Sequence, residues 1–197
     1  MRCSGPSALA VICCAISTVF VPGCWAQDAG TRARAILSDS SKSAAEAREG
    51  LLSLGDAAVD PVIHALLTER DAAQPRQAFL VGILASLHSA KSNRALGRVL
   101  DDTRSLVRAN AAIALGKKHE ACAVPELIRL LDDHAEYGKD VSTDPYKEKT
   151  LTVGAAASKA LDTIIGARTH ASGERLRVIA ETWWGKNRSG LDCKGWN

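Results

Sequence analysis

Two short amphipathic helices follow one another directly in the segment 107–133, and this pairing constrains the fold more than any other feature of the sequence. Each helix carries an apolar stripe of helical spacing. The stripe residues are Val107, Ala111, Ala114 and Leu115, then Val124, Leu127, Ile128 and Leu131. Gly116 is predicted to take the left-handed turn after the first helix, and Pro125 suits the first turn of the second. Neither helix is long enough to be stable alone, so neighbouring helices must cover both stripes.

The same pattern recurs at unequal spacing in other parts of the chain. Pro61 begins a second helix as Pro125 does, whereas Arg94 stands at this place in the next unit. The last fifteen residues hold three tryptophans, which we expect to cap the open end of the core. The chain is predicted to begin with a leader (1–26) and an extension (27–42) that contains a stub helix at about 31–37. A helical array (43–184) follows, with units at approximately 43–70, 75–102, 105–133 and 150–184 and a loop insertion at 134–149. The chain ends in a tail (185–197).

The segment VRANAAIALGKKHEACAVPELIRLLDD closely resembles a HEAT repeat of the short, alanine-rich kind found in phycobilin-lyase-like proteins. The ending ALDTIIG…ETWWGKN resembles the closing unit of exported bacterial HEAT-repeat proteins. The resemblance implies an all-α fold, an α-solenoid of about four HEAT-type helical hairpins. It also implies that the second helices line a concave face that docks a partner. A bilin-lyase-like enzyme or accessory is one alternative, although one fold hosts many unrelated functions.

The first 26 residues have the composition of a secretory signal peptide. Arg2 supplies a positive start, the run from Ala8 to Val21 has no charge, and small residues precede a predicted cleavage before Gln27. This run of about 14 residues is short for a membrane span of about 20. We therefore expect an exported chain, periplasmic or secreted. Val21-Pro22-Gly23-Cys24 also looks like a degenerate lipobox, so a lipid-anchored structural protein of the envelope is a second alternative.

Removal of the leader would leave two cysteines, Cys122 and Cys193. Export makes a disulfide chemically possible. We nevertheless predict that these thiols remain unpaired, because Cys122 lies in a turn on one edge of the array and Cys193 follows a last helix that should end on the opposite edge. Their spacing fits no zinc motif.

The sequence contains no motif for catalysis: it has no G-x-S-x-G, no H-E-x-x-H and no glycine-rich phosphate loop. His119-Glu120 invites comparison with HEAT-fold iron hydroxylases, but in those enzymes such pairs recur between repeats, and here one pair stands in a turn. We predict no cofactor and no metal. The net charge of +3 is made of interspersed charges of both signs, which argues against a nucleic-acid partner. The predicted function is a non-catalytic protein–protein interaction scaffold, or adaptor, of the cell envelope.

Two groups of residues are predicted to bind the partner. Arg98 and Arg129 recur at one register of adjacent second helices, where they could grip an acidic segment through bidentate hydrogen bonds. The insertion 134–149 holds both tyrosines of the chain, Tyr137 and Tyr146, in polar surroundings that should leave them exposed. Long loops in compact arrays commonly have a function, and tyrosine is frequent at interfaces.

Overall fold

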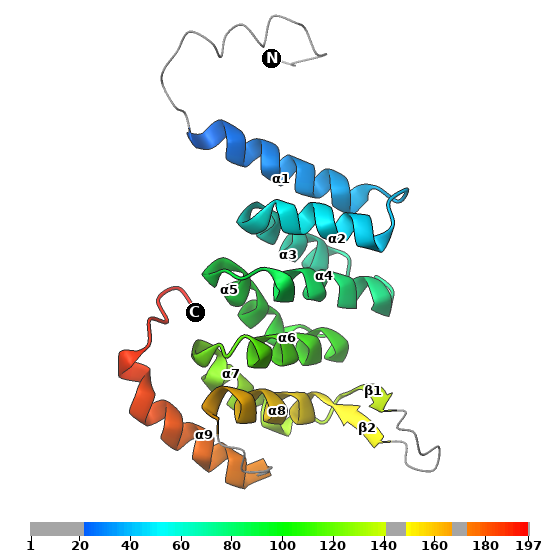
Figure 1. Cartoon of the computed structure of the whole chain (residues 1–197). Helices are drawn as coiled ribbons and strands as arrows, with labels where there is room; N and C mark the ends of the chain where they lie inside the picture. The colour runs from blue at the N-terminus through cyan, green and yellow to red at the C-terminus, as the bar shows by residue number, and fades with distance from the viewer. Residues whose placement is uncertain (1–21, 141–148, 167–172, 197) are drawn as a thin grey trace, which may run out of the picture.

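The computed structural model describes residues 22–140, 149–166 and 173–196 (Figure 1). Most of the predicted leader lies outside these residues, as does Tyr146. The described chain is predominantly helical, as predicted. Its helices are α1 (Pro22–Ser38), α2 (Ala44–Ser53), α3 (Val59–Thr68), α4 (Gln74–Ser86), α5 (Ala90–Arg98), α6 (Ser105–Lys117), α7 (Val124–Arg129), α8 (Val153–Ile165) and α9 (Gly173–Asn187). Short 3₁₀ turns are η1 (Gly55–Ala58), η2 (Val99–Asp101), η3 (Ala121–Ala123), η4 (Leu130–Asp132) and η5 (Arg188–Gly190).

The first helices of the predicted units lie one above another in the order α2, α4, α6 and α8 (Figure 1). Each packs against the next, and the second helices α3, α5 and α7 lie behind them. At the N-terminal end, α1 packs on α2, α3 and η1. It is longer than the predicted stub helix and runs through the position before Gln27 at which cleavage is predicted. Proline is compatible with a first helical position, so Pro22 begins this helix rather than breaking it. Within the described residues, no helix combines the length and the apolar character needed to cross a membrane.

The core is built from the apolar stripes of these helices. Leu115 on α6 is completely buried, as are the stripe residues Val107 and Leu127. Every other unit also contributes large, fully buried side chains: Leu51, Leu66, Leu80, Ile83, Leu84, Leu96, Leu100, Leu161 and Leu176. The helical period of the sequence therefore identifies the core-facing side of these helices.

Gly116 does not take the predicted left-handed turn. It lies inside α6, and a Cβ on it would come 2.7 Å from the Cα of Ala160 on α8. The residue with positive φ is His119, at 51°. The N–H groups of His119 and Glu120 donate to the carbonyls of Gly116 and Leu115, each at 3.0 Å, which is the pattern of a Schellman helix end. Gly116 thus permits the close approach of α6 and α8, and the helix ends two residues later than predicted.

The insertion 134–149 is not simply a loop, because its two ends pair as strands. β1 (Glu136–Asp140) runs antiparallel to β2 (Lys149–Thr152), with Gly138 opposite Leu151. Backbone hydrogen bonds extend this pairing to the start of α8, where Gly154 N–H donates to the carbonyl of Asp133 at 2.8 Å. A Cβ at Gly154 would lie 2.5 Å from the carbonyl oxygen of Leu131, so only glycine lets α8 begin this close to η4. The hairpin is therefore fixed to the third unit.

The C-terminal helix α9 turns back and runs beside α7 and α8 (Figure 1). Arg177 anchors it, because its guanidinium lies 2.6 Å from the carboxylate of Asp132. The tail then reaches η3, the turn between α6 and α7, where Cys193 and Cys122 form a disulfide. The prediction that these thiols are unpaired is wrong. It assumed that the last helix ends on the far edge of the array, whereas α9 carries the chain back across it.

The crossing of α6 and α8 gives a stability prediction. Gly116→Ala should destabilise the protein by about 1–3 kcal/mol, because the added methyl meets the backbone of α8 and the helices must separate. Gly82→Ala is the matched control, since a Cβ at this position of α4 meets nothing within 4 Å. It should be neutral or stabilising by up to about 1 kcal/mol through helix propensity. Urea unfolding of both variants measures the difference, and equal effects would show that the helices do not meet at Gly116.

Candidate functional site

A groove of about 900 Å³ lies between α6, α8 and the hairpin. Its lining includes Ile113, Lys117, Tyr137, Leu151, Ala155 and Lys159. The crossing of α6 and α8 explains its position. Gly116 and Ala160 contribute almost no side chain to the surface between the helices, so this surface is recessed. We call this hollow the α6–α8 groove.

The α6–α8 groove combines an apolar surface with lysines. Ile113, Tyr137 and Leu151 are half-buried, whereas Lys117 and Lys159 are exposed. The carboxylate residue Asp162 also belongs to the lining. Half-buried apolar side chains beside flexible charged groups provide contact area and a polar margin of the kind found at binding surfaces.

The structure places the predicted site residues on different parts of the chain. Tyr137 lies in the α6–α8 groove, on β1, and packs against the core instead of standing exposed. The pairing of β1 with β2 causes this, because it holds the strand against α6. Tyr146 lies outside the described residues and stays a sequence prediction. Arg98 and Arg129 lie on the second helices α5 and α7 and do not belong to the lining of the α6–α8 groove.

Arg98 and Arg129 occupy equivalent positions. They are the last residues of α5 and α7, both are exposed, and a 3₁₀ turn follows each. Arg129 lies 3.5 Å from the carboxylate of Asp101 on η2, with the two side chains 62% and 68% exposed. An ion pair this exposed contributes little to stability. The guanidinium of Arg129 therefore remains accessible to a partner.

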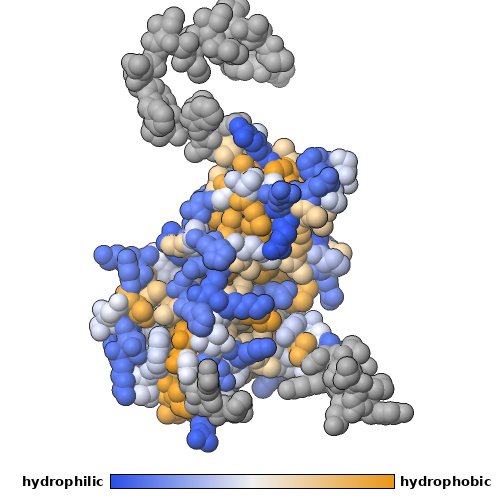
Figure 2. All heavy atoms as spheres, in the orientation of Figure 1, coloured by the Kyte–Doolittle hydropathy of each residue, from blue (hydrophilic) through white to orange (hydrophobic). Residues whose placement is uncertain are grey.

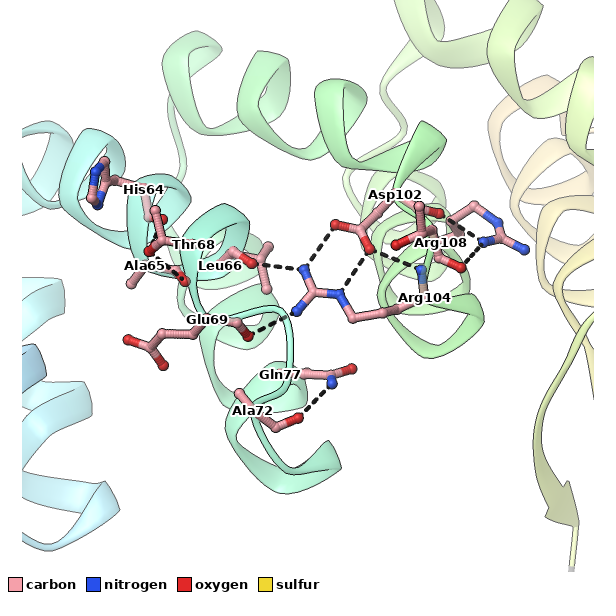
Figure 3. Close-up of polar contacts among 11 residues, drawn as sticks. His64, Ala65, Leu66, Thr68, Glu69, Ala72, Gln77, Asp102, Arg104 and Arg108 are labelled. Carbon is pink, nitrogen blue, oxygen red and sulfur yellow. Dashed lines mark hydrogen bonds and ion pairs between the residues drawn. The ribbon is translucent and has the colours of Figure 1, made fainter.

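The most concentrated polar cluster lies where the first two units meet the third (Figure 3). The guanidinium of Arg104 makes two hydrogen bonds to Asp102, each at 2.8 Å. It also donates to the carbonyls of Leu66 and Glu69 at 2.7 and 3.2 Å, where α3 ends. Arg108 repeats the arrangement by donating to Asp133 at 2.8 Å and to the Asp102 carbonyl at 2.7 Å.

This cluster joins neighbouring units. Burial opposes ionisation of Asp102, but the hydrogen bonds from Arg104 outweigh burial and hold the pKa of Asp102 below its ordinary value. Shifted pKa values can mark functional sites. Here, however, the guanidinium of Arg104 is directed at the chain's own carboxylate and carbonyl groups (Figure 3), and the two side chains are only 14% and 6% exposed. We therefore interpret the cluster as structural.

Neither His119 nor Glu120 is placed as a metal ligand. Glu120 accepts hydrogen bonds from the backbone N–H of Cys122 at 3.2 Å and from the amide of Asn93 at 2.5 Å, so it caps η3 and links it to α5. Among the described residues, no group of three or more His, Cys, Asp or Glu side chains could hold a metal ion.

A smaller hollow of about 300 Å³ lies on α9, lined by Val178, Ile179 and Trp183 among others. Figure 2 shows apolar side chains exposed in the region of α9, between polar ones. Val178 is 53% exposed. Among these three residues, the sequence analysis assigned Trp183 to the end cap of the core, and its ring is partly buried against the core.

No model of a known protein family matches the chain, and no curated protein matches it. The site is therefore interpreted from its own geometry.

The ion pair at the unit boundary predicts a pH-dependent loss of stability. Because the pKa of Asp102 is lowered in the folded state, its contribution is complete above the unfolded value of 3.8 and is lost as the pH falls through the folded pKa. At pH 7, Arg104→Lys should cost about 1–3 kcal/mol, since lysine cannot serve the carboxylate and both carbonyls together. Arg175→Lys, at an exposed position of α9, should stay within about 0.5 kcal/mol. Urea unfolding at pH 7 and pH 3 tests both points; the cost of Arg104→Lys should shrink at the lower pH.

The left-handed position of His119 gives a second stability prediction. His119→Gly should stabilise the protein by about 1 kcal/mol, because glycine adopts positive φ without the steric cost of a Cβ. His119→Ala keeps that cost and should not stabilise. Thermal or urea unfolding distinguishes them, and a loss of stability in the glycine variant would show that the imidazole makes a contact stronger than the relieved strain.

Proposed function

We propose that this chain is an exported, non-catalytic interaction scaffold built as a HEAT-type solenoid, and that the α6–α8 groove binds a segment of a partner protein. Stacked first helices and the recurrence of equivalent residues support the architecture. Asp101-Asp102 and Asp132-Asp133 end successive units in the same way, after Arg98 and Arg129. The disulfide between Cys122 and Cys193 supports export, since such bonds persist in oxidising compartments.

The observation that carries the binding proposal is the lining of the groove. Tyr137 and Leu151 from the hairpin face the same hollow as Ile113 from α6, and all three are half-buried. A volume of about 900 Å³ lies within the range of sites that enclose apolar ligand groups. The partner segment should therefore present apolar side chains, with tyrosine contacts giving much of the binding energy.

The lysines specify the charge of that segment. Lys117 and Lys159 stand exposed beside the apolar lining, so acidic residues should flank the apolar side chains of the partner. Exposed ion pairs add little affinity, but they accelerate association and weaken as salt rises. The partner is thus a protein or peptide with an acidic, apolar segment, and no nucleic acid is required.

The test uses the full oxidised chain as bait in extracts of the native envelope, with bound proteins identified by mass spectrometry and then titrated individually. Ala155→Arg should weaken the identified complex at least tenfold, because it places a long charged side chain in the groove. Ala90→Arg is the matched control: it is also exposed and in the first turn of a helix, but it lies on α5. Both variants should keep the helical circular dichroism of the parent. Full binding by Ala155→Arg, or equal losses in both variants, would contradict the proposal.

A further inference from the structure

The C-terminal tail lies across the second helices. Its disulfide joins Cys193 to Cys122 in η3, the turn between α6 and α7, 71 residues earlier in the sequence. The indole of Trp196 rests on Gly97 of α5, where a Cβ would come 2.9 Å from the ring. The indole N–H also donates to the carboxylate of Glu126 on α7 at 3.3 Å. The tail therefore bridges two adjacent second helices.

The recess that Trp196 fills lies next to arginines of the second helices. Residues three and four apart share one side of a helix. Arg94 therefore lies on the side of α5 that holds Gly97, and Arg98 stands one turn beyond Arg94. Arg129 lies on the side of α7 that holds Glu126. Gly195 approaches Arg94, since a Cβ on this glycine would lie 3.8 Å from the arginine Cδ. The tail thus occupies the recess at Gly97, with Arg94 of α5 on one side and the carboxylate of Glu126 of α7 on the other.

A covalent bond keeps this short segment in place. Hydrogen bonds within the tail are local, from Leu191 N–H to Arg188 and from Trp196 N–H to Cys193. Across to the helices it contributes the disulfide, the indole contact and the indole hydrogen bond. The disulfide holds the indole beside its recess at a high effective concentration. Without it, the same contacts would have to compete with any ligand of similar chemistry.

We propose that residues 188–196 are a redox-latched cover, and that its release exposes a second binding face for an acidic peptide with an aromatic side chain. The aromatic group would replace Trp196 in the recess at Gly97. Its carboxylates would pair with Arg94, Arg98 and Arg129, for which arginine offers bidentate hydrogen bonds. This face is separate from the α6–α8 groove, so the two proposals fail independently.

A dithiol reductant performs the release. Its thiolate attacks the sulfur of Cys193, which is more exposed than the buried Cys122, and Cys122 leaves as a thiolate. The second thiol of the reductant then displaces Cys193. The protein disulfide gains two electrons and two protons to give two thiols, and the reductant becomes a disulfide.

The first test uses the tail itself as the probe. A fluorescein-labelled peptide of residues 188–197, with Cys193→Ser, is titrated by fluorescence polarisation against full-length proteins. The oxidised wild type should bind it at least tenfold more weakly than the Cys193→Ser/Trp196→Ala variant, whose recess is empty. Adding Gly97→Ala to that variant should abolish binding, whereas Gly82→Ala, the same change in an open part of α4, should not. Equal binding by the oxidised and open forms, or binding that survives Gly97→Ala, would overturn the cover.

Two further measurements complete the test. In the unaltered protein, tryptic cleavage after Lys194 should accelerate at least tenfold on reduction with dithiothreitol, and an unchanged rate would overturn the latch even if the variants failed to fold. A second probe that also carries Lys194→Glu should bind the open form at least threefold more tightly at low salt, and high salt should remove the gain. Absence of this gain would overturn the assignment of an acidic partner.

Discussion

Guanidinium groups connect the ends of the second helices to the units that follow. The last carbonyl groups of a helix have no intrahelical hydrogen-bond partners. An array of short helices has many such ends, and each needs donors from elsewhere in the chain. Arg104 supplies donors for the end of α3, and Arg108 for the stretch after η2. Asp102 and Asp133 hold these guanidinium groups in position. These hydrogen bonds fix the position of each unit relative to the next. The stacking of the first helices depends on that position, and so does the recess between α6 and α8.

The helical stripes could be predicted from the sequence because they depend on local spacing. Leu115 and Leu127 are buried because they stand on apolar stripes of helical spacing, which neighbouring helices cover. Gly116 shows where local reasoning ends: a glycine after an apolar run suits both a helix end and a close helix contact. The choice depends on Ala160, a residue 44 positions away by number that meets it only in the folded chain. His119, a residue type that is more frequent at positive φ than most residues other than glycine, takes the turn instead.

The candidate sites were predictable in part. The equivalent register of Arg98 and Arg129 follows from the repeat, and the structure places them at matching helix ends. Tyr137 of the insertion was predicted to be exposed, but the pairing of β1 with β2 holds it half-buried. The path of α9, which brings Cys193 to Cys122, depends on contacts such as Arg177 with Asp132 that no periodicity reports. Two residues in the sequence could have indicated where the tail lies: Gly97 inside α5, which leaves a recess, and Trp196, whose ring fills it.

The disulfide also determines which parts of the chain would carry a mechanical load. When tension is applied to the two ends of the folded chain, force entering through the tail reaches Cys193 and passes directly to Cys122. The residues between them, which include α7, the hairpin strands, α8 and the whole of α9, form a closed covalent ring that the load bypasses. Stretching would therefore separate α1 to α6 first, while α7 to α9 remain held together in the shielded loop.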